Sequence, residues 1–152
     1  MAVQLLTALL GTLGFSILFH VAWKRIPFAA LGGLISWGAY LLFLPLAGDD
    51  VLVANLLATA VATAYAEVLA RLYKSPATVF IIPAVIPLIP GGSLYYTMYS
   101  VVTGDMDAFS SYGTATGAAA LGIALGILAV TSLFNLITAL RHSSRKNRKT
   151  VS

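Results

Sequence analysis

Long runs of apolar residues, separated by short segments that carry charges, make up most of the chain. The runs span residues 3–23, 28–47, 51–70, 76–103 and 114–140. A helix of about 20 apolar residues crosses the roughly 30 Å hydrocarbon core of a bilayer. The pattern therefore predicts an all-α integral membrane protein with about five transmembrane helices. We expect a single membrane domain over residues 1–140 and a basic tail over residues 141–152.

The composition supports this class and removes several others. Of 152 residues, 59% are hydrophobic and 9% are charged, whereas about 25% are charged in typical soluble domains. The absence of cysteine excludes disulfides, thiolate metal sites and cysteine nucleophiles. No nucleophile and base at catalytic spacing, no phosphate-binding loop and no zinc signature is found. The sequence thus predicts no enzyme activity, no cofactor and no bound metal.

The charges alternate in sign from one connection to the next. The basic connections hold Lys24, Arg25, Arg71 and Lys74 and lead to the basic tail, and the others hold Asp49, Asp50, Asp105 and Asp107. If all five runs cross, every Lys and Arg lies on one face, which the positive-inside rule makes cytoplasmic. The N-terminus is then outside and the C-terminus inside. We expect the tail to set topology and to contact anionic membrane lipids, and we expect no nucleic-acid binding.

The fourth run is predicted to be a helix that breaks near residues 83–92. Pro83, Pro87 and Pro90 lie inside it, and each interior proline frees the carbonyl four residues earlier, which predicts three free oxygens. Gly91 and Gly92 permit unusual backbone dihedrals, and Ser93 is a suitable N-cap for a second half-helix. Irregular backbone is tolerated in a bilayer only where protein or a wet cavity satisfies it. The break therefore predicts an interior path.

The second half-helix has the features of a binding site for a small carboxylate or zwitterion. Its free amides near residues 92–95 suit a carboxylate, and the freed carbonyls suit a cation or an ammonium group. A polar stripe that ends at Thr103 follows at helical spacing. The candidate substrate-binding residues are Pro83, Pro87, Pro90, Gly91, Gly92, Ser93, Tyr96, Thr97 and Ser100. The competing interpretation is a structural proline kink whose hydroxyls bond their own helix.

A few other polar residues lie inside or at the ends of the runs. Glu67 is the one acid within a run and is a candidate for proton or ion coupling. The alternative is an ion pair with Arg71, four residues later on the same helix, that has no role in transport. His20, in the predicted interface, is the second candidate for proton handling. Asn55 and Asn135 are interpreted as interhelical hydrogen-bonding residues.

Glycines recur four residues apart in the last run, as Gly113 and Gly117 and again as Gly122 and Gly126. Such pairs let two helices approach closely, so we predict that they pack against a helix of this chain or of another. A homo-oligomer is compatible with this pattern.

The segment from Lys74 to Tyr99 resembles the threonine/serine exporter family, and within it the small membrane subunit of the YjjB type. The specific part is the spacing Pro-x3-Pro-x2-Pro-Gly, which ends at Gly91, with Tyr-Thr-Met after it. A weaker similarity covers residues 14–21 and the second run. The matching segment contains Pro83, Pro87, Pro90, Gly91, Ser93, Tyr96 and Thr97.

The resemblance implies an exporter half of about five helices in the bacterial cytoplasmic (inner) membrane. It implies a larger subunit of the YjjP type as partner, and a small-molecule substrate such as threonine, serine or the dicarboxylate succinate. It also implies that an ion gradient drives export. The alternative function is a non-transporting membrane scaffold or assembly subunit, whose glycines clamp a partner.

Overall fold

The computed structural model describes residues 1–149, with side chains described for residues 1–140, and this part of the chain is all helical. In chain order the elements are α1 (Ala2–Leu18), α2 (Ile26–Leu46), α3 (Val51–Leu72), α4 (Thr78–Val85), the 3₁₀ turn η1 (Ile86–Leu88), α5 (Gly91–Thr103) and α6 (Met106–Lys149). The predicted all-α fold class is confirmed. Residues 150–152, the end of the predicted tail, lie outside the described part.

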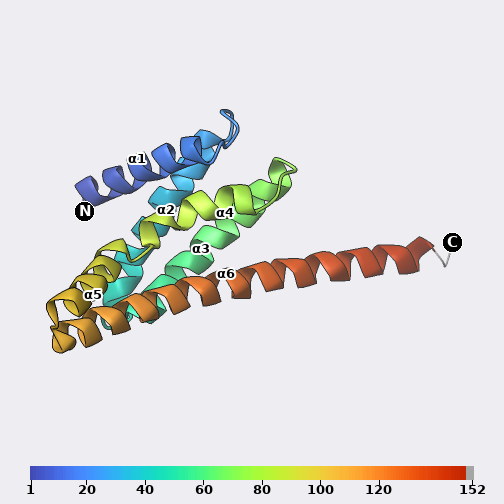
Figure 1. The fold of residues 1–152 in the computed structure, drawn as a ribbon. Helices are drawn as coiled ribbons and strands as arrows, with labels where there is room; N and C mark the ends of the chain where they lie inside the picture. Colours follow the sequence, from blue (N-terminus) through green and yellow to red (C-terminus); the bar gives the residue numbers. More distant parts are fainter. Residues whose placement is uncertain (150–152) are drawn as a thin grey trace.

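The helices form a bundle in which α2 and α3 occupy the middle (Figure 1). α1 packs on α2, and α6 packs along the other side on α3. α4 leans against both α2 and α3, and α5 turns away from it to lie along α6. This arrangement places the junction between α4 and α5 beside α2, α3 and α6.

Three helices are long and apolar enough to cross a membrane, namely α2, α3 and the part of α6 from Met106 to Leu140. α4 with η1 and α5 form a bent pair that makes a fourth span if the two halves are counted together. α1 is apolar but has only 17 residues, because it ends at Leu18 instead of continuing to residue 23 as predicted. The multi-pass class is therefore confirmed, and five crossings stays a prediction.

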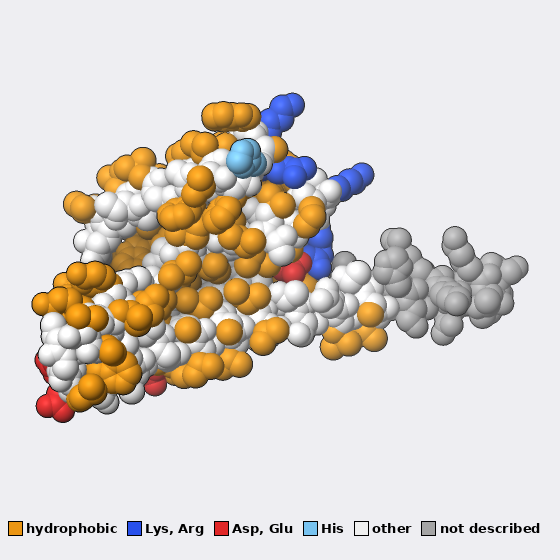
Figure 2. Space-filling model, in the orientation of Figure 1, with side chains coloured by type: hydrophobic (Ala, Val, Ile, Leu, Met, Phe, Trp, Pro, Cys, Tyr) orange, Lys and Arg blue, Asp and Glu red, His pale blue; other side chains and the backbone are white. Residues whose placement is uncertain are grey.

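The basic side chains and the aspartates lie at opposite ends of the bundle. Figure 2 shows Lys and Arg together at the end near the turn between α1 and α2, and the aspartates at the opposite end. Two aspartates cap helices there. The carboxylate of Asp50 accepts the amides of Leu52 at 2.9 Å and Val53 at 3.2 Å, and that of Asp105 accepts the amide of Ala108 at 3.0 Å. These acids therefore stabilise the starts of α3 and α6.

α6 is longer than the sequence analysis predicts at both ends. It begins at Met106 instead of residue 114, because Asp105 caps it and Gly104 ends α5 with a left-handed backbone (φ 76°). It also continues as helix to Lys149, through most of the segment predicted as a tail. Its 44 residues correspond to roughly 66 Å, so α6 projects beyond the bundle at the basic end (Figure 1).

Two glycines of α6 allow its close approach to α3. A methyl group on Gly122 would run into the carbonyl oxygen of Leu52, and one on Gly126 would lie 2.7 Å from the carbonyl oxygen of Leu56. A methyl on Gly113 would make only an ordinary contact, 3.6 Å from a methyl of Thr97, and one on Gly117 would meet nothing within 4 Å in the described structure. The pair nearer the C-terminus is therefore the one that fits α6 to α3.

We predict that Gly126→Leu destabilises the protein, because the side chain cannot fit between α6 and the backbone of α3. Overpacking of this kind costs about 1–3 kcal/mol or more. The measurement is the midpoint of thermal unfolding in detergent, followed by size-exclusion chromatography. Gly117→Leu, on the same helix but in open space, is the matched control and should leave the midpoint unchanged. Equal midpoints for the two variants would contradict the close α3–α6 contact.

Candidate functional site

The membrane helix formed by α4 and α5 is interrupted at residues 86–90, as the proline pattern predicts. α4 ends at Val85, η1 adds one tight turn, and Ile89 is extended (φ −62°, ψ 124°) before α5 begins at Gly91. The two halves differ in direction by 56°. The first turn of α5 therefore starts beside α2, α3 and α6, with Gly91 and Gly92 exposed and Ser93 partly buried.

Fewer backbone carbonyls at the break are free to bind a ligand than the sequence predicts. The carbonyl of Pro83 accepts the amide of Ile86, and the carbonyl of Ile86 accepts the amide of Ile89 at 3.1 Å. The expectation of three freed oxygens is therefore wrong for these two, because the chain tightens into 3₁₀ geometry and satisfies them. A cation site built from these carbonyls is not supported.

The start of α5 also differs from the prediction. Pro90, not Ser93, occupies the N-cap position, and the Ser93 hydroxyl donates to the carbonyl of Pro90 at 3.2 Å. The amide of Gly91 donates to the carbonyl of Ile89 at 2.7 Å, and the amide of Leu94 donates to the carbonyl of Pro90 at 2.9 Å. Within the described residues, the amides of Gly92 and Ser93 have no partner. Two free donors therefore remain at the positive end of the helix dipole.

These amides border a cavity of about 330 Å³, a size that is in the range for small-molecule sites. Both sides of the break line it through residues 87–93, and the neighbouring helices complete the wall with Trp37, Tyr40, Val51, Asn55, Ala115 and Ala119. The lining contains no ionised side chain. The cavity thus brings together α2, α3, α6 and the broken helix.

Two side-chain atoms in this lining are buried without a hydrogen-bond partner. Trp37 contributes an indole N–H donor, and Asn55 contributes its Oδ1 acceptor. The Nδ2 group of Asn55 is already used, since it donates to the carbonyl of Val51 at 2.8 Å. Leaving such a buried group unsatisfied costs about 1–3 kcal/mol. Both atoms lie within the wall, and neither has surface that a water molecule can reach.

The rest of the predicted polar stripe lies away from this cavity. Thr97 donates to the carbonyl of Ser93 at 2.7 Å and lies 3.4 Å from the hydroxyl of Thr116 on α6. Ser100 donates to the carbonyl of Tyr96 at 2.8 Å, and the Tyr96 ring stacks on Tyr112, with 5.2 Å between centroids. Of the nine candidate residues, Pro87, Pro90, Gly91, Gly92 and Ser93 line the cavity. Tyr96, Thr97 and Ser100 fit α5 to α6 instead.

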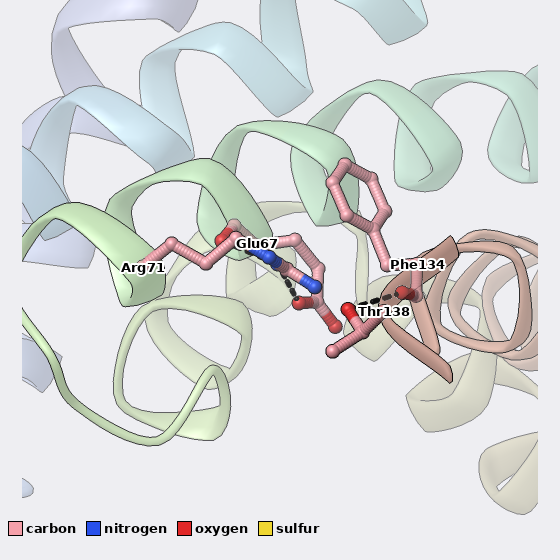
Figure 3. Close-up of polar contacts among 4 residues, drawn as sticks. All are labelled: Glu67, Arg71, Phe134 and Thr138. Carbon is pink, nitrogen blue, oxygen red and sulfur yellow. Dashed lines mark hydrogen bonds and ion pairs between the residues drawn. The ribbon is translucent and has the colours of Figure 1, made fainter. Parts of the chain in front are cut away.

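Glu67 and Arg71 form an ion pair at the basic end of the α3–α6 contact (Figure 3). The Arg71 guanidinium lies 2.6 Å from Oε2 of Glu67 and 2.8 Å from its carbonyl oxygen, and it covers the ring of Phe134 at 4.5 Å. The Glu67 side chain is only 7% exposed, whereas that of Arg71 is 44% exposed. Glu67 is twelve residues, or about 18 Å, along α3 from Asn55, so it does not line the cavity.

His20 and Pro83 lie in a different part of the molecule. His20 is exposed in the turn after α1, where its backbone is left-handed (φ 55°). It borders a second cavity, of about 400 Å³, together with Arg25 and Pro83. The structure therefore separates His20 from Glu67 and from the break.

Sequence reasoning missed Trp37 and Tyr40. Both carry a polar tip on an aromatic body, and they are three residues apart in the middle of the second run, so they share one face of a helix. Their rings stack with 5.2 Å between centroids. This spacing is the signal that could have indicated a polar wall, but nothing in the sequence shows that the face meets the break.

We predict that Arg71→Gln destabilises the protein by about 1–3 kcal/mol, because it leaves the Glu67 carboxylate buried without its partner. The double variant Glu67→Gln with Arg71→Gln should recover most of the loss, since no buried charge remains. Thermal unfolding in detergent gives the comparison. A double variant as unstable as Arg71→Gln alone would show that the pair is not the cause.

The comparisons with known proteins agree with the exporter resemblance. Residues 4–133 match the family model described as "Threonine/Serine exporter, ThrE". No solved structure matches the chain. The matched residues contain the whole helix break and every residue that lines the cavity beside it. Because this match covers well over half of the chain, the protein belongs to the threonine/serine exporter family of membrane transporters.

Proposed function

We propose that this chain is a subunit of a secondary exporter that moves small carboxylate-bearing metabolites through the cavity at the helix break. Family membership supports export as the activity. One observation carries the location of the site: two unpartnered backbone amides at the positive end of α5 border a cavity whose wall is completed by α2, α3 and α6.

The lining favours an amino acid as substrate. The amides of Gly92 and Ser93, at the positive end of α5, bind the carboxylate. When their side chains turn toward the cavity, Oδ1 of Asn55 accepts a hydrogen bond from the ammonium group and the indole N–H of Trp37 donates to a hydroxyl, as threonine or serine carries. A dicarboxylate such as succinate is the second candidate, because Trp37 also suits a second carboxylate. Succinate has no ammonium group to donate to Oδ1 of Asn55, and this weighs against succinate.

We propose further that the chain is of the YjjB type and works with a larger YjjP-type subunit in the bacterial inner membrane. The separation of basic and acidic ends supports an orientation with the N-terminus outside and the C-terminus in the cytoplasm (Figure 2). One chain offers few helices for a path that opens alternately to both sides, and transporters commonly place their site between two related parts. A homo-oligomer is the alternative assembly.

The scaffold alternative receives less support. Its clamp required glycines that face a partner, but Gly122 and Gly126 contact α3 of the same chain. The buried, unpartnered polar groups of the cavity also have no use in a passive scaffold.

The proposed function is tested by measuring efflux from cells that lack native exporters and are preloaded with threonine or succinate. We expect efflux of threonine, and weaker efflux of succinate. The cells express this chain alone, the candidate larger subunit alone, or both. Efflux only with both subunits is the expected result. No efflux of either solute, with both proteins verified in the membrane, would overturn the exporter proposal for these substrates.

A second prediction tests the amide site directly through one residue. Gly92→Pro removes the amide donor, yet proline is tolerated in the first turn of a helix and Gly91 accommodates the restriction it imposes on the preceding residue. Gly92→Ala keeps the donor, and its methyl meets nothing within 4 Å in the described structure. Since a hydrogen bond to a charged group contributes about 1.5–3 kcal/mol, we expect efflux to fall by about tenfold or more with proline and to stay near normal with alanine.

Equal efflux by the two variants would place the carboxylate elsewhere. Both proteins must first be shown to reach the membrane at equal levels, so that the comparison reports binding and not folding.

A further inference from the structure

The cavity that His20 borders lies between the turn that joins α1 to α2 and the helix α4. Its volume is about 400 Å³, which is in the range for small-molecule sites. It shares no lining residue with the cavity at the helix break. The turn contributes His20 and Arg25 to its lining, and α4 contributes Thr78, Val79 and Ile82. The cavity therefore combines a guanidinium and an imidazole with an apolar wall.

The positive charge of Arg25 is not neutralised by the chain. Its guanidinium donates to the carbonyl of Tyr73, at the end of α3, over 3.5 Å. All five acids of the chain lie in the described part: the four aspartates are at the opposite end of the bundle (Figure 2), and Glu67 pairs with Arg71. Arg25, which is partly buried, therefore has no carboxylate within 4 Å. A partly buried charge without a counter-ion favours an anion beside it.

Two further residues of the lining offer hydrogen-bond donors to such an anion. His20 follows the end of α1 with a left-handed backbone (φ 55°), and the amide of Val21 then turns back to the carbonyl of Ser16 at 3.0 Å. Thr78 is the first residue of α4, and its amide has no partner within the described residues. The positive end of the α4 dipole adds to the attraction. Arg25, His20 and Thr78 thus place several donors around one space.

The surroundings indicate a membrane lipid as the source of the anion. Val79 and Ile82 give the cavity an apolar side, and Ile82 and Phe19 are each about half exposed. Trp23, in the same turn, is 79% exposed, and tryptophan is enriched at the boundary between membrane and water. A phospholipid places its phosphate at this boundary and its acyl chains along apolar side chains, whereas a soluble phosphate makes no use of an apolar wall. Basic pockets between transmembrane helices are suited to lipid head groups.

We propose that this cavity binds the head group of one anionic phospholipid, such as phosphatidylglycerol. The planar guanidinium of Arg25 binds the phosphate oxygens, and His20 and Thr78 donate further hydrogen bonds to them. The first part of an acyl chain follows Val79 and Ile82 along α4. The lipid thereby joins the turn between α1 and α2 to the first half of the broken helix. This binding depends on the shape and donors of the cavity, unlike the attraction of lipid to a basic tail by charge alone.

The site is tested by adding phosphatidylglycerol to the full chain, freed of lipid in a neutral detergent, and measuring the bound lipid by native mass spectrometry. The variants are Arg25→Gln and Lys24→Gln. Both lose one positive charge from the same turn, but only Arg25 lines the cavity. We expect the affinity to fall by about tenfold or more with Arg25→Gln, because charge-assisted hydrogen bonds are lost, and to stay near normal with Lys24→Gln. An equal loss in both variants would show that surface charge alone attracts the lipid, and would overturn the site.

Two other ligands separate the possible sources of the phosphate. Phosphatidylcholine has the same phosphate but adds the positive charge of choline, and glycerol 3-phosphate has a phosphate without acyl chains. We expect each to bind about tenfold more weakly than phosphatidylglycerol, or worse, because choline is repelled by Arg25 and the soluble ligand leaves the apolar wall unused. Glycerol 3-phosphate bound as tightly as phosphatidylglycerol would overturn the lipid as occupant. Phosphatidylcholine bound as tightly would overturn the preference for an anionic lipid.

The place of the lipid is tested without changing any polar group, so the proposal stays testable if Arg25→Gln does not fold. Because the chain has no cysteine, Ile82→Cys and Leu18→Cys each introduce a single thiol. Both positions are exposed, by 48% and 65%, but only residue 82 lines the cavity. At a phosphatidylglycerol concentration about ten times its Kd, we expect maleimide labelling at residue 82 to slow by about tenfold, since only the lipid-free fraction reacts. Labelling at residue 18 should not change. Equal slowing at both positions, or none at either, would overturn the site.

Discussion

The hydrocarbon core of a bilayer offers no hydrogen-bond partners, so every backbone amide and carbonyl within it must be satisfied by the protein or by enclosed water. The break between α4 and α5 is where this constraint is most demanding. Tight 3₁₀ bonds from Ile86 and Ile89 satisfy the carbonyls there, but the amides of Gly92 and Ser93 remain without partners. α2, α3 and α6 line the cavity beside these amides.

Small residues let the surrounding helices come close enough to enclose the break. Gly122 and Gly126 bring α6 against the backbone of α3, and a methyl on Gly32 would lie 2.9 Å from Cβ of Ala84, which shows how closely α4 fits α2. These contacts contain little side-chain volume and no charge. They hold Asn55 at the cavity and bury the threonines of α3, so the packing that stabilises the bundle also defines where polar groups gather.

The helical class was predicted from the apolar runs, the broken helix from the prolines and glycines, and the separation of charge from the alternating signs of the connections. Each of these features depends on residues that are neighbours along the chain. The details of the site depended on contacts between distant segments. The N-cap role predicted for Ser93 was wrong because Pro90 ends the extended segment three residues earlier. Trp37 and Asn55 were not assigned to the site, because only the packing of α2 and α3 brings them to the break. Thr97 has the spacing of a binding residue, yet it packs on α6.

The absence of an acidic residue at the start of α5 has a kinetic consequence. Asp50 caps α3 and Asp105 caps α6, so the partial positive charge at each of these helix ends is neutralised by a carboxylate. Pro90 occupies the N-cap of α5, which has no acid in its first turn, so its end is left to attract an anion. A ligand held by backbone dipoles leaves without breaking an ion pair to a lysine or arginine. Such a site favours modest affinity and a short residence time, which suits a protein that must release what it carries against a rising external concentration.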